Sequence, residues 1–385
     1  MLLELKMKEM INPTQTAFFC SIMLFSSKLL ILPSLLFKEN GYGGIFCLGF
    51  ALLFDLLILY FFIKLKEKYN NQTLKEILSA FLNKVFVKIL LFILFAFFIT
   101  RFIYILQESF HFLKLALYNK ATVFTFLICI FPVVDALVFK GLKAFGRSLE
   151  IFYYIIIVGI LICSIIWISS LSNYGFNIFE NNSFLGLFNG IYNYTFWFCD
   201  FIFLFVIMDK IKIENNYGKK LMKYSIFTAF VCLFICFSFY YIYQSVSFFQ
   251  TDALFALIQF SSRIGYVGKV DIFALYPLIF VMYFQYGMLL YCAKECYKWI
   301  LNTKNEVQPI IISNILIILI FYFFFQNSDN LLSISTSILN HLGMFVGYVF
   351  PLILFLFYIS QKNKQPESVF RKKIIKNYSK LNNIN

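Results

Sequence analysis

Ten apolar runs of about the length needed to cross a lipid bilayer follow one another along the chain. A membrane-spanning helix needs about 20 residues. The runs cover residues 14–38, 44–63, 85–115, 121–139, 148–169, 186–208, 221–246, 271–298, 309–326 and 340–360. This pattern predicts an all-α integral membrane protein with ten transmembrane helices.

The first and sixth runs are interrupted near their middle by polar residues. The first contains Ser26-Ser27-Lys28, and Pro33 follows. The sixth contains Gly190, then Tyr192-Asn193-Tyr194-Thr195, Trp197 and Asp200. Proline removes a helical hydrogen bond and hydroxyls can serve freed backbone groups, whereas a charge at the bilayer centre costs about 2.5 kcal/mol or more. We expect two broken helices that line a cavity at the membrane midplane. For the first run, the alternative is a kinked structural helix whose lysine pairs with a carboxylate elsewhere.

The two interrupted runs lie five helices apart, and this odd offset inverts the second half of the chain relative to the first. Broken helices at matching positions of inverted halves indicate a binding site at the midplane. The sequence therefore predicts a five-plus-five inverted repeat with broken helices 1 and 6. The first repeat covers about 14–170 and the second about 186–360, between a cytoplasmic lead (1–13) and a basic cytoplasmic tail (361–385).

Composition supports a membrane protein, since 61% of the 385 residues are hydrophobic and 14% are charged. Soluble domains average about 45–50% apolar and about 25% charged residues. With both termini in the cytoplasm, 26 of the 33 Lys and Arg residues fall on the inner side and 5 on the outer side. This bias follows the positive-inside rule. The distribution of basic residues therefore explains the net charge of +14 by the membrane topology. It excludes nucleic acid as a partner.

Two shorter segments connect the predicted spans. Residues 64–84 are charged, and Thr73-x-x-Glu76 resembles a capping box that opens a short amphipathic surface helix. Residues 247–270 are predicted to be a loop. The nine cysteines lie in or beside apolar runs without the further ligands that zinc requires. The sequence also lacks a hydrolase triad, a P-loop and a redox motif, so we expect no enzyme activity, cofactor or metal.

Charged residues inside the spans are candidates for the site. Lys28 either attracts an anionic ligand group or neutralises Asp55 or Asp200. Arg101 lies too far from either end of its span to reach water, and it either pairs with Asp55 or binds a carboxylate. Asp200 offers a protonatable group for proton coupling, or it is the partner of Lys28.

Helical spacing places Arg101, Tyr104, Glu108 and His111 on one face of the third span. Glu108 and His111 are either an outer gate or proton relay, or an interfacial pair that faces water. The candidate ligand-binding residues are Ser26, Ser27, Lys28, Arg101, Tyr104, Tyr192, Asn193, Thr195 and Trp197. At the second break, the polar groups either line a ligand site or form hydrogen bonds with backbone groups that the break leaves free. Trp197 is either an aromatic lid over that site or a core residue.

Several short motifs, taken in order, resemble one protein family. They are INPTQTAFF (11–19), Leu32-Pro33-Ser34, Gln72-Thr73-Leu74 and SSRIGYVGKVDIFALYPLIFVMYF (261–284). With the chain length and span number, they resemble the permease-like B subunit of spore germinant receptors, a branch of the amino acid–polyamine–cation permease superfamily. Where that superfamily usually has a glycine-rich break in helix 1, this chain has Ser26-Ser27-Lys28.

The resemblance implies a receptor subunit that binds a small nutrient germinant, an amino acid or similar, and signals through partner subunits. It implies an A subunit with its own membrane region and a lipoprotein C subunit, in the spore inner membrane. A proton-coupled amino-acid permease is the alternative function, and a scaffold that has lost ligand binding is a third. The bilayer itself is the remaining partner.

Overall fold

The computed structural model describes residues 10–25, 28–116, 122–169, 184–250, 252–263, 271–325 and 339–360. Across these residues the regular structure is helical, apart from one isolated parallel β-bridge between Ile11 and Ile211. Six helical stretches are long and apolar enough to cross a membrane, and two shorter apolar helices cover Val123–Phe139 and Val307–Phe323. The prediction of an all-α protein with several membrane-spanning helices is confirmed.

The helices of the first half follow the apolar runs closely. They are α2 (Pro13–Leu24), α3 (Lys28–Asn40), η1 (Gly41–Gly43), α4 (Gly44–Lys68), α5 (Leu74–Phe81), α6 (Lys84–Ala116), α7 (Val123–Phe139) and α8 (Leu142–Ser169). The first predicted span is thus divided into α2 and α3. Pro33 lies inside α3, and its carbonyl oxygen accepts a hydrogen bond from Tyr240 Oη at 2.8 Å.

The second half begins with another divided segment. It contains α9 (Phe184–Asn193), η2 (Thr195–Phe198), α10 (Ile202–Ile207) and η3 (Met208–Lys210). There follow α11 (Tyr217–Tyr243), η4 (Gln244–Phe248), α12 (Ala253–Arg263), α13 (Asp271–Leu301), α14 (Val307–Phe325), α16 (Asn340–Met344), η6 (Phe345–Val349) and α17 (Phe350–Ser360). We call the interval from 194 to 201, between α9 and α10, the helix-6 break, and the end of α2, at Leu24 and Phe25, the helix-1 break.

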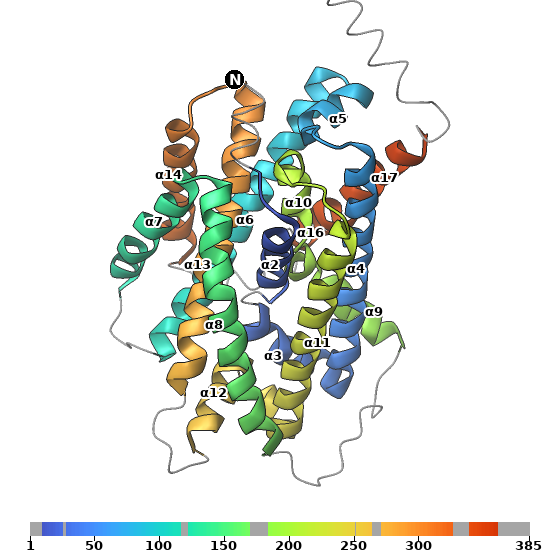
Figure 1. The fold of residues 1–385 in the computed structure, drawn as a ribbon. Helices are drawn as coiled ribbons and strands as arrows, with labels where there is room; N and C mark the ends of the chain where they lie inside the picture. Colours follow the sequence, from blue (N-terminus) through green and yellow to red (C-terminus); the bar gives the residue numbers. More distant parts are fainter. Residues whose placement is uncertain are drawn as a thin grey trace, which may run out of the picture.

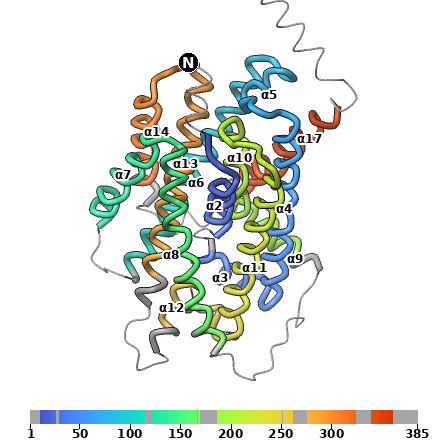
Figure 2. The backbone as a smooth tube through the Cα atoms, viewed as in Figure 1, coloured from blue at the N-terminus to red at the C-terminus, as the bar shows by residue number. Residues whose placement is uncertain are grey.

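Two long helices, α6 and α13, form the packed centre of the bundle. The rings of Phe102 and Tyr286 lie 5.0 Å apart between these helices, and Tyr286 Oη donates to the carbonyl oxygen of Ile105 at 3.3 Å. In Figures 1 and 2, α2 and α3 follow one another near the middle, with α7 and α14 on one flank and α4 and α17 on the other. The flanking helices carry large exposed apolar side chains such as Phe124 (72% exposed) and Phe323 (69% exposed). Such a surface suits a lipid environment.

The short helix α5 confirms the predicted capping box. The Glu76 N–H donates to Thr73 Oγ1 at 3.2 Å, and the Thr73 N–H donates to Glu76 Oε2 at 2.8 Å. One face of the helix is buried through Leu74, and Lys75 Nζ donates to the carbonyl oxygen of Trp299 at 2.9 Å, which ties α5 to the end of α13. We call this end of the molecule the α5 end.

The predicted loop over 247–270 is wrong for residues 253–263, which form α12. The apolar run there is too short to indicate a membrane span, and its helical form depends on tertiary contacts. Leu257 and Ile258 are buried against the neighbouring helices. The Leu257 carbonyl oxygen accepts a hydrogen bond from Trp167 Nε1 at 3.2 Å, and Tyr243 Oη donates to the Ala256 carbonyl oxygen at 2.7 Å.

Candidate functional site

Arg101 of α6 binds the backbone of the helix-6 break. Its guanidinium donates to the carbonyl oxygen of Phe196, to that of Trp197 at 2.9 Å, and to Asp200 Oδ1 at 3.4 Å. It also lies over the Phe196 ring, 5.2 Å from the centroid. Only 5% of the Arg101 side chain and 1% of the Asp200 side chain are exposed. Because the break interrupts the helical hydrogen-bond ladder, the fork of the arginine supplies donors that a continuous helix would have supplied.

Asn340 of α16 also forms hydrogen bonds with backbone groups at the helix-6 break. Its Nδ2 donates to the carbonyl oxygen of Tyr192, and its Oδ1 accepts the N–H of Phe196 at 3.3 Å. The neighbouring His341 Nε2 lies 3.2 Å from Tyr192 Oη. A Cβ atom placed on Gly343 would lie 2.7 Å from Phe196 Cα, so only glycine permits this close approach of α16 to the break.

The predicted face of α6 contacts the break through three kinds of interaction. Arg101 binds its carbonyl groups, as described above. The Tyr104 ring packs edge-on against Trp197 and Phe196, with centroids 4.9 and 5.7 Å apart. Trp197 Nε1 donates to Glu108 Oε1 at 3.1 Å, and both side chains are buried. The structure thus brings three of the four predicted side chains to one segment.

His111, the fourth residue of that face, contacts a different element. Its Nδ1 lies 3.4 Å from Oδ2 of Asp252, the residue that precedes α12. The histidine side chain is 55% exposed, whereas Asp252 is buried. The structure therefore joins His111 to α12, whereas Glu108 binds the tryptophan of the helix-6 break.

Hydroxyl and amide groups beside the break are used in short-range contacts. Tyr194 Oη donates to Glu39 Oε1 at 2.8 Å, and Asn193 Nδ2 lies 3.4 Å from Glu39 Oε2. These bonds connect the end of α9 with the end of α3. Thr195 Oγ1 donates to the carbonyl oxygen of Tyr192 at 2.8 Å, which serves a backbone group where α9 ends.

The helix-1 break is supported from α13 and α11. Gln285 of α13 is fully buried, and its Nε2 donates to the carbonyl oxygen of Ile22 at 2.9 Å. Cys232 Sγ of α11 lies 3.8 Å from the carbonyl oxygen of Leu24, the last residue of α2. Helix ends leave four carbonyl groups without intrahelical partners, and such groups need partners at membrane depth. Both breaks thus depend on side chains from neighbouring helices.

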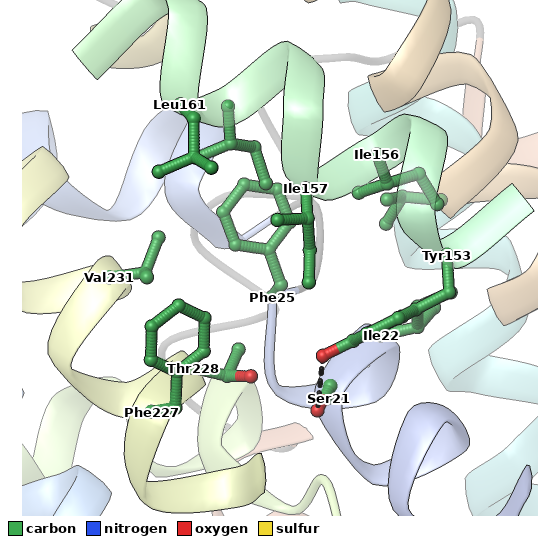
Figure 3. Close-up of a pocket in the computed structure, with 12 residues that line it drawn as sticks. Ser21, Ile22, Phe25, Tyr153, Ile156, Ile157, Leu161, Phe227, Thr228 and Val231 are labelled. Carbon is green, nitrogen blue, oxygen red and sulfur yellow. Dashed lines mark hydrogen bonds between the residues drawn. The ribbon is translucent and has the colours of Figure 1, made fainter. Parts of the chain in front are cut away.

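A small cavity lies beside the helix-1 break (Figure 3). Its volume is about 40 Å³, and its walls are almost entirely apolar apart from the hydroxyls of Ser21, Tyr153 and Thr228. Tyr153 Oη donates to Ser21 Oγ at 3.4 Å. Phe25 lines this cavity and also a second one of about 20 Å³.

The other predicted charged residues are only partly described. Asp55 of α4 is buried, and Tyr348 of η6 lies within electrostatic range of both Asp55 and Asp200. Ser26 and Ser27 lie outside the described residues. Lys28 is described only as the first backbone position of α3. The predicted roles of these three polar residues stay predictions.

Sequence reasoning missed several polar residues that hold the breaks. Asn340 and Gln285 are amides within apolar runs, and this contrast is the signal that could have identified them. Glu39 lies just past the end of the first apolar run and gave no such signal. Among the described residues, no group of three or more His, Cys, Asp or Glu side chains could hold a metal ion. The site offers an arginine, carboxylates, amides and backbone groups, which suit recognition of a small polar molecule.

Solved transporter structures share this fold. A substrate-bound, outward-open Na⁺-coupled sialic acid symporter aligns with a TM-score of 0.55 and 11% identity over 86% of this chain and 79% of that one. A manganese transporter from Eremococcus coleocola, in complex with an aromatic bis-isothiourea compound, aligns with a TM-score of 0.55 and 12% identity over 89% of this chain and 78% of that one. The chain therefore shares its fold with these two transporter structures.

The family follows from the sequence. The family model described as "Spore germination protein" matches residues 10–331, which is most of the chain. No curated protein matches the chain. The chain belongs to the spore germination protein family and is an integral membrane, permease-like protein.

Proposed function

We propose that this protein is the membrane-embedded ligand-binding subunit of a spore germinant receptor. Its ligand is a small nutrient, an amino acid or similar, which binds between the helix-1 and helix-6 breaks at the midplane of a ten-helix, five-plus-five inverted repeat. Both termini lie in the cytoplasm. The family, the transporter fold and the two breaks support this proposal.

One observation carries the proposal, namely the binding of Arg101 to the helix-6 break. The guanidinium contacts two backbone carbonyl groups and Asp200 in a buried setting. A ligand carboxylate competes for this guanidinium through charge-assisted bidentate hydrogen bonds, which are about twice as strong as neutral ones. When the arginine turns to the ligand, the carbonyl groups of Phe196 and Trp197 lose their donors and the break rearranges. A ligand that favours the rearranged state shifts the equilibrium toward it.

The rearrangement displaces other helices, because their residues contact the helix-6 break. Trp197 is bonded to Glu108 of α6, and Phe196 packs against Gly343 of α16. Movement of either contact displaces α6 or α16. In the proposed receptor, an A subunit with its own membrane region and a lipoprotein C subunit detect this displacement.

A proton-coupled amino-acid permease is the second candidate, favoured by the buried carboxylates. Asp55 and Asp200 lie inside the bundle, and Tyr348 is within electrostatic range of both. Ionisable groups at membrane depth mark proton and substrate pathways in transporters. The two candidates share the binding site and differ in whether the ligand crosses the membrane.

Thermal stability of the purified protein tests the proposal. Wild type is screened against amino acids, nucleosides and sugars, since a ligand at 100 times its dissociation constant stabilises the folded state by about 2.7 kcal/mol. We expect at least one amino acid to raise the unfolding temperature, and we expect Lys28→Ala and Arg101→Lys to abolish the increase. Lys64→Ala, which removes an exposed lysine of α4, is the charge-matched control and should respond as wild type does.

Failure of every compound, or equal responses from all four proteins, would contradict binding at the breaks. Uptake of the stabilising compound into proteoliposomes then separates the two candidates. The receptor proposal predicts binding without accumulation. Accumulation driven by a proton gradient would establish the permease instead.

A further inference from the structure

A charged cleft of about 220 Å³ lies at the α5 end of the molecule, away from both breaks. It is formed where α7 turns into α8, opposite α13 and the start of α14, and we call it the α7–α8 cleft. Its charged lining comprises Lys140, Lys143, Lys210, Lys294, Glu295 and Glu306. The volume is several times the ~30 Å³ of a water molecule, so a small polar group fits.

The acidic side chains of the cleft neutralise the inner lysines only. Lys294 is buried, and its Nζ lies 2.8 Å from Glu306 Oε2 and 3.6 Å from Glu295 Oε1. Lys210 Nζ lies 3.2 Å from Glu295 Oε2. Four lysines against two glutamates leave an excess of two positive charges in the lining. The excess lies with Lys140 and Lys143, for whose side chains the described residues provide no hydrogen-bond or ion-pair partner.

The start of α8 adds backbone donors to the same wall. Its first helical hydrogen bond runs from the Phe145 N–H to the Gly141 carbonyl oxygen at 3.1 Å. The N–H groups of Leu142, Lys143 and Ala144 precede this bond and have no intrahelical acceptor. Gly141, with φ +81°, makes the turn and has no side chain that could cap the helix. Such a helix start attracts anions, here beside two lysines.

The cleft also borders the apolar surface that faces lipid. Phe139, the last residue of α7, lines the cleft and is 49% exposed. On α14, Ile310 lines the cleft, and the next residue, Ile311, is 50% exposed. Asn314 Nδ2 donates to both carboxylate oxygens of Asp135 at 2.9 and 3.0 Å, which fixes α14 beside α7 (Figure 1). A molecule with its charged group in the cleft can therefore place acyl chains along these two helices.

We propose that the α7–α8 cleft binds the phosphate group of an anionic phospholipid. Lys140 and Lys143 attract the phosphate, the first turn of α8 donates hydrogen bonds to it, and the acyl chains lie against α7 and α14. A zwitterionic phospholipid also has a phosphate group, but its own cation removes the net attraction. A free phosphate matches the polar wall but makes no use of the apolar surface beside it.

Lipid binding to the full-length protein can be measured by native mass spectrometry from detergent micelles. The micelles contain equal amounts of phosphatidylglycerol and phosphatidylcholine, and a separate arm contains inorganic phosphate without lipid. Wild type is compared with Lys140→Ala/Lys143→Ala and with the charge-retaining Lys140→Arg/Lys143→Arg. The matched control, Lys219→Ala/Lys220→Ala, removes two neighbouring lysines at the start of α11, outside the cleft lining.

We expect wild type, the arginine variant and the control to retain phosphatidylglycerol in preference to phosphatidylcholine. A lysine near an anionic lipid surface contributes about 5.4-fold in affinity, so the alanine pair should weaken phosphatidylglycerol binding by about 30-fold. Equal retention of the two lipids by wild type would overturn the proposal, as would equal losses in the alanine pair and the control. Binding of inorganic phosphate as tight as that of phosphatidylglycerol would overturn a phospholipid as the occupant.

Discussion

Replacement of Arg101 by glutamine should destabilise the protein more than any single change among the exposed charges. The substitution removes the Arg101 cation from the Asp200 carboxylate, which is 1% exposed, and it removes the donors to the Phe196 and Trp197 carbonyl groups. Removal of one partner of a buried ion pair costs about 3–5 kcal/mol. Asp200→Asn should cost less, because Arg101 keeps its two carbonyl acceptors.

The double variant Arg101→Gln/Asp200→Asn separates the interaction energy of the pair from the contribution of each residue alone. Because it leaves no isolated buried charge, its loss of stability should be smaller than the sum of the single losses by about 1–3 kcal/mol. Thermal unfolding of the four purified proteins in the same detergent provides the measurement. The exposed pair Lys64 and Glu67, 3.2 Å apart, is the control, and its removal should leave the unfolding temperature unchanged. Strictly additive effects at Arg101 and Asp200 would refute the coupling on which the account depends.

Two further predictions concern the helix-6 break and the α5 end. Gly343→Ala places a methyl group 2.7 Å from Phe196 Cα, so we expect a loss of about 1–3 kcal/mol in thermal unfolding, together with a weaker ligand response. If the Gly343→Ala variant unfolded at the wild-type temperature, α16 would be able to move away from Phe196 without loss of stability. Burial raises the pKa of Glu306, but hydrogen bonds from Lys294 and Lys298 outweigh this effect and lower the pKa to about 2, from an ordinary 4.5. This depressed pKa stabilises the fold fully above pH ~4.5, and the contribution is lost as the pH falls toward ~2. Glu306→Gln should therefore lower the unfolding temperature at pH 7, lower it less at pH 3, and lose most of its effect near pH 2, whereas a constant difference across this range would refute the assignment.

The sequence predicted the elements of this fold better than their contacts. Apolar runs and the Thr73 capping box act over a few residues, so they indicate helices without knowledge of the rest of the chain. The polar interruption of the sixth run corresponds to the interval between α9 and α10, whereas that of the first run falls largely outside the described residues. α12 was missed because a short apolar run becomes a helix only through packing against its neighbours.

Contacts between distant residues could not be predicted in the same way. Arg101 was expected to pair with Asp55 or to bind a carboxylate, and the structure joins it to Asp200, 99 residues further along the chain. Helical spacing placed Glu108 beside Arg101 on α6, but spacing within one helix carries no information about which tryptophan lies opposite. The ten-span count, the inverted repeat, the domain limits and the orientation of the termini stay predictions.

Amide hydrogen exchange at residues 194–201 tests the central claim most directly. The purified protein is measured with and without the amino acid that raises its unfolding temperature most, in wild type and in Arg101→Lys. The account predicts that the ligand changes exchange in this segment of the wild type and leaves the variant unchanged. A ligand that stabilises the protein while exchange at 194–201 stays the same in both proteins would contradict a binding site at the helix-6 break.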